Sequence, residues 1–293
     1  MKGKITMAKS YVFYNPLAGG AVENEISKLK DMLDCEAVFC DLTVTQVEEI
    51  VSELEKDDNI VICGGDGTLN RFINALNGEE LPCQVLCFPI GTGNDFAHDL
   101  GKEYGAAPFI INEYIKDLPW VEVNGIKYRF LNGVGYGIDG YCCEVGDELK
   151  KQGKPVNYTS IAIKGLLFGY QPTSAKVTVD GVSRTYKKVW IAPTMHGRFY
   201  GGGMMPTPSQ KRNNVEKELS LMVFHDTSKL RTLMIFPSIF KGEHIKHTEA
   251  VDIITGKEIT VEFDRPVALQ IDGETVLGVS SYKAYSALVK EKV

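Results

Sequence analysis

Two glycine-rich segments hold the residues best suited to chemistry in this sequence. Gly64-Gly65-Asp66-Gly67-Thr68 follows the apolar run 59–63, and Gly91-Thr92-Gly93-Asn94-Asp95 follows the apolar run 84–88. Each pattern predicts a strand that ends in a tight turn and leads into a helix. Backbone N–H groups at such turns bind phosphate, and adjacent parallel strands bring their carboxyl ends together. The two segments therefore predict a nucleotide held at neighbouring strand ends.

A carboxylate inside the first segment adds a metal to this prediction. Asp66 would lie beside the bound phosphates, which is unfavourable for a negative charge unless a cation bridges the two groups. We therefore predict Mg²⁺ with Asp66 as its ligand. Thr68 is suited to cap the following helix, and Thr92, Asn94 and Asp95 are small polar residues suited to ribose and phosphate.

A third candidate lies near the C-terminus, in Gln270-Ile271-Asp272-Gly273-Glu274. The Asp-Gly pair favours a type I′ hairpin turn, so the local interpretation is a turn. A β-rich domain that closes over a nucleotide also needs a carboxylate directed at the acceptor hydroxyl, and Asp272 or Glu274 could supply it. Gly135, Gly137 and Gly140 form a literal G-x-G-x-x-G, which we interpret as crowded backbone because no acidic strand end follows at the expected distance.

The apolar pattern divides the chain into two parts. Up to about Trp120, strand-like runs alternate with helical stripes, which is typical of a parallel sheet covered by helices. Beyond it, short runs separated by Asn-Gly and Asp-Gly pairs predict hairpins and a β-sandwich. We expect an α/β domain over 1–124, a β-sandwich domain over 125–281, and a last strand within 282–293 that returns to the first domain. Strands are expected at 11–14, 36–40, 59–63, 84–88, 127–134, 175–179, 187–192, 219–224, 258–263, 267–271 and 282–289, and helices at 22–33, 44–54, 69–76, 161–170 and 230–241.

Composition limits the function classes. The chain has 293 residues, 44% of them hydrophobic, and a net charge of −6, which argues against a protein built mainly to bind nucleic acid. The seven cysteines have no metal-site spacing, and no run reaches the roughly 18 apolar residues that span a bilayer. We expect a cytoplasmic protein with reduced thiols that meets membranes only at their surface.

The ordered motifs resemble the diacylglycerol kinase catalytic-domain family, which includes bacterial soluble lipid kinases and sphingosine and ceramide kinases and is more distantly related to NAD kinases. The resemblance rests on segments 64–70, 89–97 and 270–274, and Asn15-Pro16 with Gly19-Gly20 looks like the family's first nucleotide-contacting loop. The first motif is shared with NAD kinases and phosphofructokinases, whereas segment 91–97 is specific to the lipid kinases.

The resemblance implies an NAD kinase-like, Rossmann-like ATP-binding domain, a β-sandwich lipid-substrate domain, and a kinase that uses ATP and Mg²⁺ to phosphorylate a lipid hydroxyl, with diacylglycerol or a related lipid alcohol as the expected acceptor. It implies Asp66 beside the phosphates and the metal, Asp272 as the general base, and Lys164 as a charge-stabilising residue. Nucleotide contacts are implied for Asn15, Pro16, Gly64, Gly65, Asp66, Gly67, Thr68, Asn70, Gly91, Thr92, Asn94, Asp95 and Glu122.

The sequence also departs from the family. Many members hold a structural Mg²⁺ with an Asp-Asp-Gly, whereas segment 208–218 has no Asp pair, and Glu216 could replace it only in part. Two alternatives stay open: an NAD kinase-like enzyme with a soluble acceptor, and a catalytically weak lipid- or nucleotide-binding protein. Segments 161–170 and 230–241 mix large apolar residues with bases, so they could pack in the core or form a rim that meets lipid. Exposed sandwich edges could also support a homodimer.

Overall fold

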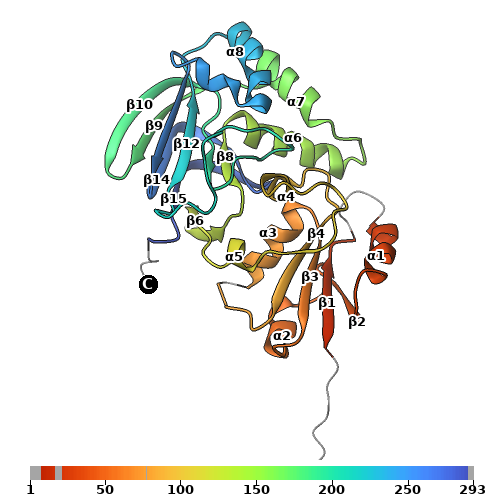
Figure 1. The fold of residues 1–293 in the computed structure, drawn as a ribbon. Helices are drawn as coiled ribbons and strands as arrows, with labels where there is room; N and C mark the ends of the chain where they lie inside the picture. Colours follow the sequence, from red (N-terminus) through yellow and green to blue (C-terminus); the bar gives the residue numbers. More distant parts are fainter. Residues whose placement is uncertain (1–7, 17–21, 77, 290–293) are drawn as a thin grey trace, which may run out of the picture. The chain divides into compact units, whose positions relative to one another are not determined.

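The computed structural model describes residues 8–16, 22–76 and 78–289. The chain divides into two compact units, Met1–Asp117 and Leu118–Val293 (Figure 1). The first is an α/β unit with a mostly parallel sheet, and the second is built on an antiparallel sheet. Both fold classes predicted from the sequence are confirmed.

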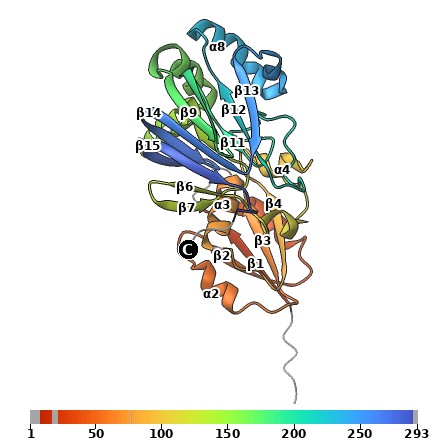
Figure 2. The same cartoon turned by 90° about the vertical axis from the view of Figure 1, so that its left-hand side faces the viewer.

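The first unit is a five-stranded sheet in the order β2-β1-β3-β4-β5. Strands β1 to β4 are labelled in Figure 2. The first four strands run parallel, and β5 pairs antiparallel with β4. The strands are β1 (Lys9–Tyr14), β2 (Glu36–Asp41), β3 (Asn59–Gly64), β4 (Gln84–Pro89) and β5 (Phe109–Ile110). The helices are α1 (Val22–Lys30), α2 (Val47–Ser52), α3 (Asp66–Ala75), α4 (Asp95–Asp99) and α5 (Asn112–Ile115).

The central strands of this unit are buried on both faces. Phe13 of β1, Ile62 of β3 and Val85 of β4 have no exposed surface. Phe72 of α3 packs its ring 5.2 Å from that of Phe13, which fixes α3 against the sheet. Near-continuous apolar strands are expected where helices cover a parallel sheet. This packing holds the glycine turns, which directly follow β3 and β4, in fixed positions.

Helix boundaries differ from those predicted because turns shorten the helices. The helix expected over 44–54 begins only at Val47, since the backbone N–H and hydroxyl of Thr43 both bond to Asp41 Oδ1. Side-chain bonds of this kind favour a turn over a helix. The helix expected over 22–33 ends at Lys30.

The second unit contains ten strands and six helical segments within its described residues. The strands are β6 (Trp120–Val123), β7 (Ile126–Arg129), β8 (Gly133–Tyr136), β9 (Thr173–Val179), β10 (Val182–Val189), β11 (Thr194–Met195), β12 (Leu219–Phe224), β13 (Val251–Gly256), β14 (Glu258–Ile271) and β15 (Glu274–Tyr285). The helices are α6 (Ile138–Lys151), α7 (Tyr158–Lys164) and α8 (Lys229–Ile235), with one π turn, η1 (Gly165–Gly169), and two 3₁₀ turns, η2 (Phe236–Lys241) and η3 (Glu243–Lys246).

The long strand β14 organises this antiparallel sheet. Its first half lies between β9 and β15, and its second half lies between β8 and β15, with a register shift after Glu262. The sequence predicts two strands here, 258–263 and 267–271, but the structure has one irregular strand. The change of partner lets the sheet fold around a shared core, where the rings of Tyr136 and Phe263 stack 3.8 Å apart.

Three predicted hairpin turns are confirmed. Each joins consecutive strands through two residues with positive φ, as a type I′ turn requires. The φ pairs are 52° and 78° at Asn124-Gly125, 47° and 83° at Asp180-Gly181, and 47° and 96° at Asp272-Gly273.

Three further predicted strands of the second unit differ in their bounds. The strand expected over 187–192 is the end of β10, which stops at Val189. The strand expected over 127–134 splits into β7 and β8, because the backbone N–H groups of Leu131 and Asn132 bond to the carboxylate of Asp272. The strand expected over 282–289 is the end of β15, which stops at Tyr285 and pairs there with β6 and β14. Stacking of Tyr285 on Trp120 at 4.0 Å accompanies this pairing.

Candidate functional site

The two glycine turns meet at one edge of the parallel sheet. Gly64 and Pro89 are paired at the ends of β3 and β4, and the turns that follow touch backbone to backbone. A Cβ atom on Gly65 would lie 2.8 Å from Gly91 Cα, and one on Gly91 would lie 2.7 Å from Gly65 N. Real Cβ atoms do not approach so closely. Glycine is therefore required at both positions for the turns to pack together.

Asn94 closes the second turn. Its φ of 50° places it in the left-handed region, which asparagine tolerates better than most residues. Its Oδ1 accepts a 2.9 Å hydrogen bond from the Gly91 N–H, and its Nδ2 donates a 2.7 Å bond to the Gly91 carbonyl. Asn94 is buried, so it shapes the turn from within.

Asp66 ties the first turn to the second. Its Oδ2 accepts a 2.8 Å hydrogen bond from the N–H of Asp95, and its Oδ1 accepts one of 2.8 Å from the N–H of Phe96. Both N–H groups belong to the first turn of α4, where intrahelical partners are lacking. The half-buried carboxylate thus satisfies two backbone donors of the neighbouring loop.

The sequence-predicted residues of this edge fall into two groups. Gly67, Thr92 and Gly93 are exposed, so their backbone and the Thr92 hydroxyl can reach a ligand. The supporting group is buried beneath them and comprises Thr68, Asn70, Asn94 and Asp95. Asn70 accepts a 3.2 Å bond from Asn74 at its Oδ1, which fixes its amide inside α3. Most of the predicted polar side chains therefore build the turns, and the exposed backbone faces the solvent.

The predicted first loop begins at the same sheet edge. Asn15 and Pro16 follow β1, whose last residue Tyr14 pairs with Cys63 of β3. Asn15 is half-buried and Pro16 is exposed. Gly19 and Gly20 lie outside the described residues.

The donor set is compatible with Mg²⁺ bound together with phosphates. Among the described residues, no three His, Cys, Asp or Glu side chains gather as a metal site. Magnesium in phosphate sites commonly uses only one or two carboxylates, with phosphate oxygens and water completing the coordination. Asp66 supplies one carboxylate at the exposed edge. Glu216, the weak candidate for a second metal, instead bonds Lys257 Nζ at 2.8 Å and lies in the second unit.

Asp272, the predicted base, is held by the loop before β8. Its Oδ2 accepts a 2.5 Å bond from the Leu131 N–H, and its Oδ1 accepts bonds of 2.8 and 3.0 Å from the N–H groups of Asn132 and Gly133. Arg212 braces the same loop by donating to the Leu131 carbonyl and, at 2.9 Å, to Asn132 Oδ1. The Asp272 side chain is 7% exposed. The carboxylate is therefore locked in one orientation.

The other predicted residues of the second unit lie on exposed or half-exposed surface. Glu274 is exposed at the start of β15, and Lys164 is exposed at the end of α7, where it makes no ion pair with a described residue. Glu122 of β6 is in register with Lys127 and Lys283 on its two neighbouring strands. Cross-strand neighbours of opposite charge attract, so Glu122 lies in a mixed-charge ladder.

Sequence reasoning missed Asp139, at the start of α6. It is 7% exposed, and its Oδ1 has no hydrogen-bond partner, whereas Oδ2 accepts a 3.1 Å bond from the Tyr200 hydroxyl. Burial raises the pKa of this carboxyl to about 6, against the opposing effect of hydrogen bonds from Gly140, Tyr200 and Gln270. The one sequence signal that could have pointed to Asp139 is its position between Gly137 and Gly140 of the G-x-G-x-x-G pattern.

The glycines around Asp139 confirm the predicted crowding of backbone. A Cβ atom on Gly135 would lie 2.5 Å from Gln270 Nε2, and one on Gly137 would lie 2.5 Å from the Trp190 carbonyl oxygen. A Cβ atom on Gly140 would meet the backbone of Ala268. These glycines let β8 and α6 pack against β14 and are a packing feature.

Family comparisons agree with this architecture. Residues 9–118 match the family described as the diacylglycerol kinase catalytic domain, and residues 132–284 match the one described as the YegS C-terminal NAD kinase beta sandwich-like domain. The chain is 24% identical over 225 residues to a diacylglycerol kinase of Mycobacterium tuberculosis, covering 74% of this chain and 70% of the relative.

Solved structures show the same fold. A diacylglycerol kinase of Bacillus anthracis superposes with a TM-score of 0.61 at 20% identity, covering 97% of this chain and 96% of the other. Yeast NADH kinase gives a TM-score of 0.52 at 10% identity, covering 99% of this chain and 81% of the other. With both halves of the chain matched in order, this protein belongs to the diacylglycerol kinase-like family of lipid kinases.

Proposed function

We propose that this protein transfers the γ-phosphoryl group of ATP to a hydroxyl group of a lipid in a Mg²⁺-dependent reaction. The observation that carries this proposal is the pair of interlocked turns at 64–68 and 91–95, which Asp66 ties together. Exposed backbone at Gly67 and Gly93, beside the Thr92 hydroxyl, offers the donors that phosphate groups require. The similarity to a diacylglycerol kinase of Mycobacterium tuberculosis supports diacylglycerol or a related lipid alcohol as the acceptor.

The nucleotide would be held chiefly by the first unit. The exposed residues Gly67, Thr92 and Gly93 would contact the phosphates. Asn15 and Pro16 would contribute from the end of β1. The buried polar residues beneath them would keep the two turns in shape. Bound Mg²⁺ would neutralise the negative charge on the phosphates. Asp66 is the residue that would hold this ion. The two N–H bonds to Asp66 orient that carboxylate before any ligand arrives.

In the transfer step, the lipid oxygen forms a bond to the γ-phosphorus while the bond from that phosphorus to the bridging oxygen of ADP breaks. Asp272 accepts the hydroxyl proton. Three backbone N–H groups already occupy most of the roughly four lone-pair positions of a carboxylate, so Asp272 would act as a weak but well-oriented base. A weak base suffices because phosphoryl transfer depends mainly on alignment and charge neutralisation.

Lesser roles are proposed for three further residues. Glu122 would contribute to nucleotide binding through its acidic character, Lys164 would offset developing negative charge, and Glu274 is the alternative base in the same hairpin. Glu122 lies between two lysines in register, and Lys164 is exposed.

The proposal is tested by incubating the purified protein with γ-labelled ATP, Mg²⁺ and mixed-lipid vesicles, and then separating the lipids. Asp272→Asn is the inactive control. Asp180→Asn is the matched structural control, since Asp180 occupies the other Asp-Gly hairpin with a φ of 47° and also accepts bonds from two backbone N–H groups, those of Lys257 and Glu258.

A labelled lipid formed by the wild type and by Asp180→Asn, but not by Asp272→Asn, would support the kinase and identify its acceptor. Label in a soluble nucleotide instead would favour the NAD kinase-like alternative, to which the yeast NADH kinase fold is related. Nucleotide binding without transfer to any acceptor would favour the catalytically weak binding protein.

A further inference from the structure

One helical segment of the second unit exposes large apolar side chains on its outer face. Helix α8 continues into the 3₁₀ turn η2, and its inward positions Thr232, Ile235 and Ile239 are buried. The opposite face carries Leu230, Met234, Pro237 and Lys241, which recur at helical spacing and are all exposed. A surface helix normally places polar residues on its outer face. The exposed apolar residues on this face, interspersed with the exposed bases Arg231 and Lys241, therefore indicate a partner.

The apolar surface extends to the neighbouring turn η1. Phe168 is 81% exposed, Leu230 is 68% exposed, and Met234 is 67% exposed. The Lys229 ammonium donates a 3.2 Å bond to the Leu167 carbonyl, which joins the start of α8 to η1. The docking face consists of Phe168, Leu230, Met234, Pro237 and Lys241. Large apolar side chains gathered on a surface mark interaction sites.

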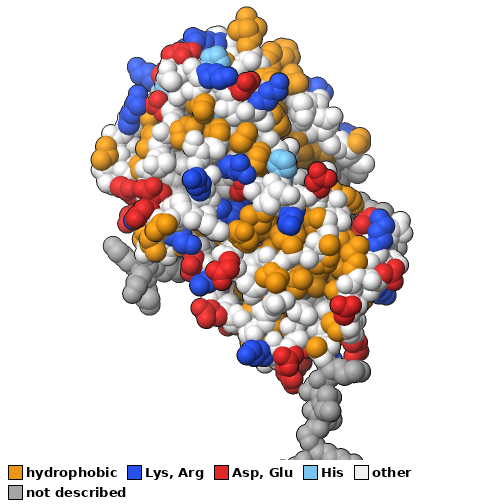
Figure 3. All heavy atoms as spheres, viewed as in Figure 1, with side chains coloured by type: hydrophobic (Ala, Val, Ile, Leu, Met, Phe, Trp, Pro, Cys, Tyr) orange, Lys and Arg blue, Asp and Glu red, His pale blue; other side chains and the backbone are white. Residues whose placement is uncertain are grey.

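The charge of these segments is opposite in sign to that of the chain. Segments 158–170 and 229–241 contain four basic residues and no acidic residue, whereas the chain has a net charge of −6. The bases are Lys164, Lys229, Arg231 and Lys241, of which Arg231 is paired with Glu249. Figure 3 shows hydrophobic and basic side chains together over α8, near the upper end of the view. Apolar side chains interspersed with bases are complementary to a bilayer that contains anionic lipids.

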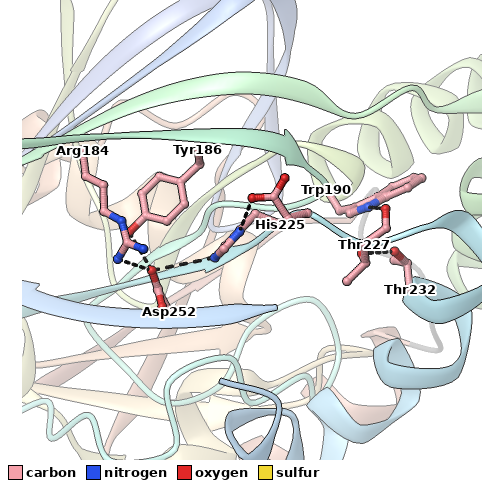
Figure 4. Close-up of polar contacts among 8 residues, drawn as sticks. Arg184, Tyr186, Trp190, His225, Thr227, Thr232 and Asp252 are labelled. Carbon is pink, nitrogen blue, oxygen red and sulfur yellow. Dashed lines mark hydrogen bonds and ion pairs between the residues drawn. The ribbon is translucent and has the colours of Figure 1, made fainter. Parts of the chain in front are cut away.

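The inner side of α8 is fixed to the sheet, which leaves the outer face available. Thr227 and Thr232 share a 2.6 Å hydrogen bond, and the Trp190 indole N–H donates a 3.4 Å bond to the Thr227 carbonyl (Figure 4). Just before them, His225 lies 3.7 Å from the carboxylate of Asp252, which also accepts bonds from Arg184 and Tyr186. The docking face is thus presented by an anchored helix.

We propose that the docking face binds the surface of an anionic lipid bilayer. The choice of a lipid surface rests on the proposed lipid-kinase function, but the binding itself needs no catalysis. None of the described helices is long and apolar enough to cross a membrane. Phe168, Leu230 and Met234 would enter the headgroup boundary, and Lys241 with its neighbouring bases would face anionic headgroups.

Co-sedimentation with vesicles tests this proposal without nucleotide. The vesicles contain either phosphatidylcholine alone or equal parts of phosphatidylcholine and phosphatidylglycerol. The wild type should bind the anionic vesicles more tightly, and added salt should weaken that binding. The variant Phe168→Glu with Met234→Glu should bind at least about tenfold more weakly, because two apolar anchors are lost and two negative charges are added.

Two further variants control for side effects. Val182→Glu changes a residue that is 76% exposed in the β9–β10 hairpin and should bind like the wild type. Lys241→Glu should weaken binding to anionic vesicles and leave binding to phosphatidylcholine nearly unchanged. Thermal melts confirm that each variant is folded. Equal binding by the wild type and the double variant would overturn the proposal, as would a wild-type dimer that the double variant converts to monomer.

Activity on a dispersed short-chain diacylglycerol separates docking from catalysis. The double variant should phosphorylate this lipid as fast as the wild type and lose activity only on vesicles. If the wild type binds anionic vesicles but phosphorylates no lipid, the kinase proposal is contradicted and the membrane-binding proposal stands. If the wild type phosphorylates dispersed lipid but does not bind vesicles, only the membrane-binding proposal is overturned.

Discussion

The carboxylate of Asp66 accepts a 2.8 Å hydrogen bond from the backbone N–H of Asp95. Together with the bond from the next N–H, that of Phe96, it joins two loops that lie about thirty residues apart in the chain. This contact gives Asp66 a structural task besides any contact with a metal. The two tasks predict different consequences of mutation.

We expect Asp66→Asn to lower the free energy of unfolding by about 1.5–3 kcal/mol in the absence of nucleotide and Mg²⁺. The reason is that an amide N–H₂ group would face a backbone donor where a charged acceptor now lies. Chemical denaturation measures the change, and Asp31→Asn, at an exposed position, serves as the control. Unchanged stability with lost activity would mean that Asp66 acts on the ligand alone.

Gly91→Ala should be more damaging than an alanine at a glycine with open space around it. The added Cβ would press on the backbone of Gly65, and overpacking of this kind typically costs about 1–3 kcal/mol. Gly101→Ala is the matched control, because its Cβ would meet nothing within 4 Å and only its φ of 70° is unfavourable. Thermal melts and nucleotide affinity should both fall for Gly91→Ala. Equal behaviour of the two variants would argue against interlocked turns.

Asp272→Asn should reduce both stability and catalysis, and Asp180→Asn should reduce stability alone. Each substitution places an amide where the carboxylate accepts backbone N–H bonds, so each should cost about 1–3 kcal/mol of unfolding free energy. Loss of a general base lowers the turnover number by about 10²–10⁴-fold. Turnover per folded molecule is the decisive measurement. If both variants lose turnover equally, Asp272 acts through the loop and not as a base.

Asp139→Asn should stabilise the protein at neutral pH. The folded-state pKa of about 6 lies above the ordinary aspartate value of 3.8, so folding favours the protonated form. This contribution is complete below pH 4 and is lost as the pH rises through 6, where the buried carboxyl must ionise. The two pKa values differ by about 2, and each pKa unit corresponds to about 1.4 kcal/mol, so the gain should be at most about 3 kcal/mol.

Melting temperatures measured from pH 4 to pH 8 test this expectation. The difference between Asp139→Asn and the wild type should be small at the acidic end and should grow through pH 6. A difference that stays constant across the range would mean that Asp139 keeps one charge state throughout.

Local patterns were enough to predict much of the fold. Alternating apolar runs located β1 to β4, and the three Asn-Gly and Asp-Gly pairs located their hairpins, because both signals act within a few residues. Strand boundaries in the second unit were less predictable. The division of 127–134 depends on Asp272, a residue about 140 positions away, and the single strand β14 depends on partners at both ends of the unit.

The sequence by itself determined where the chemistry-bearing residues lie in the chain and which type each turn has, because glycine, Asp-Gly pairs and apolar spacing restrict the backbone locally. Only the tertiary structure decided how those residues are used. It set Gly65 against Gly91, turned the Asp66 carboxylate toward the amides of α4, and left Asp139 buried with one oxygen unpaired. Such roles follow from contacts between distant segments, which pattern in one segment cannot encode.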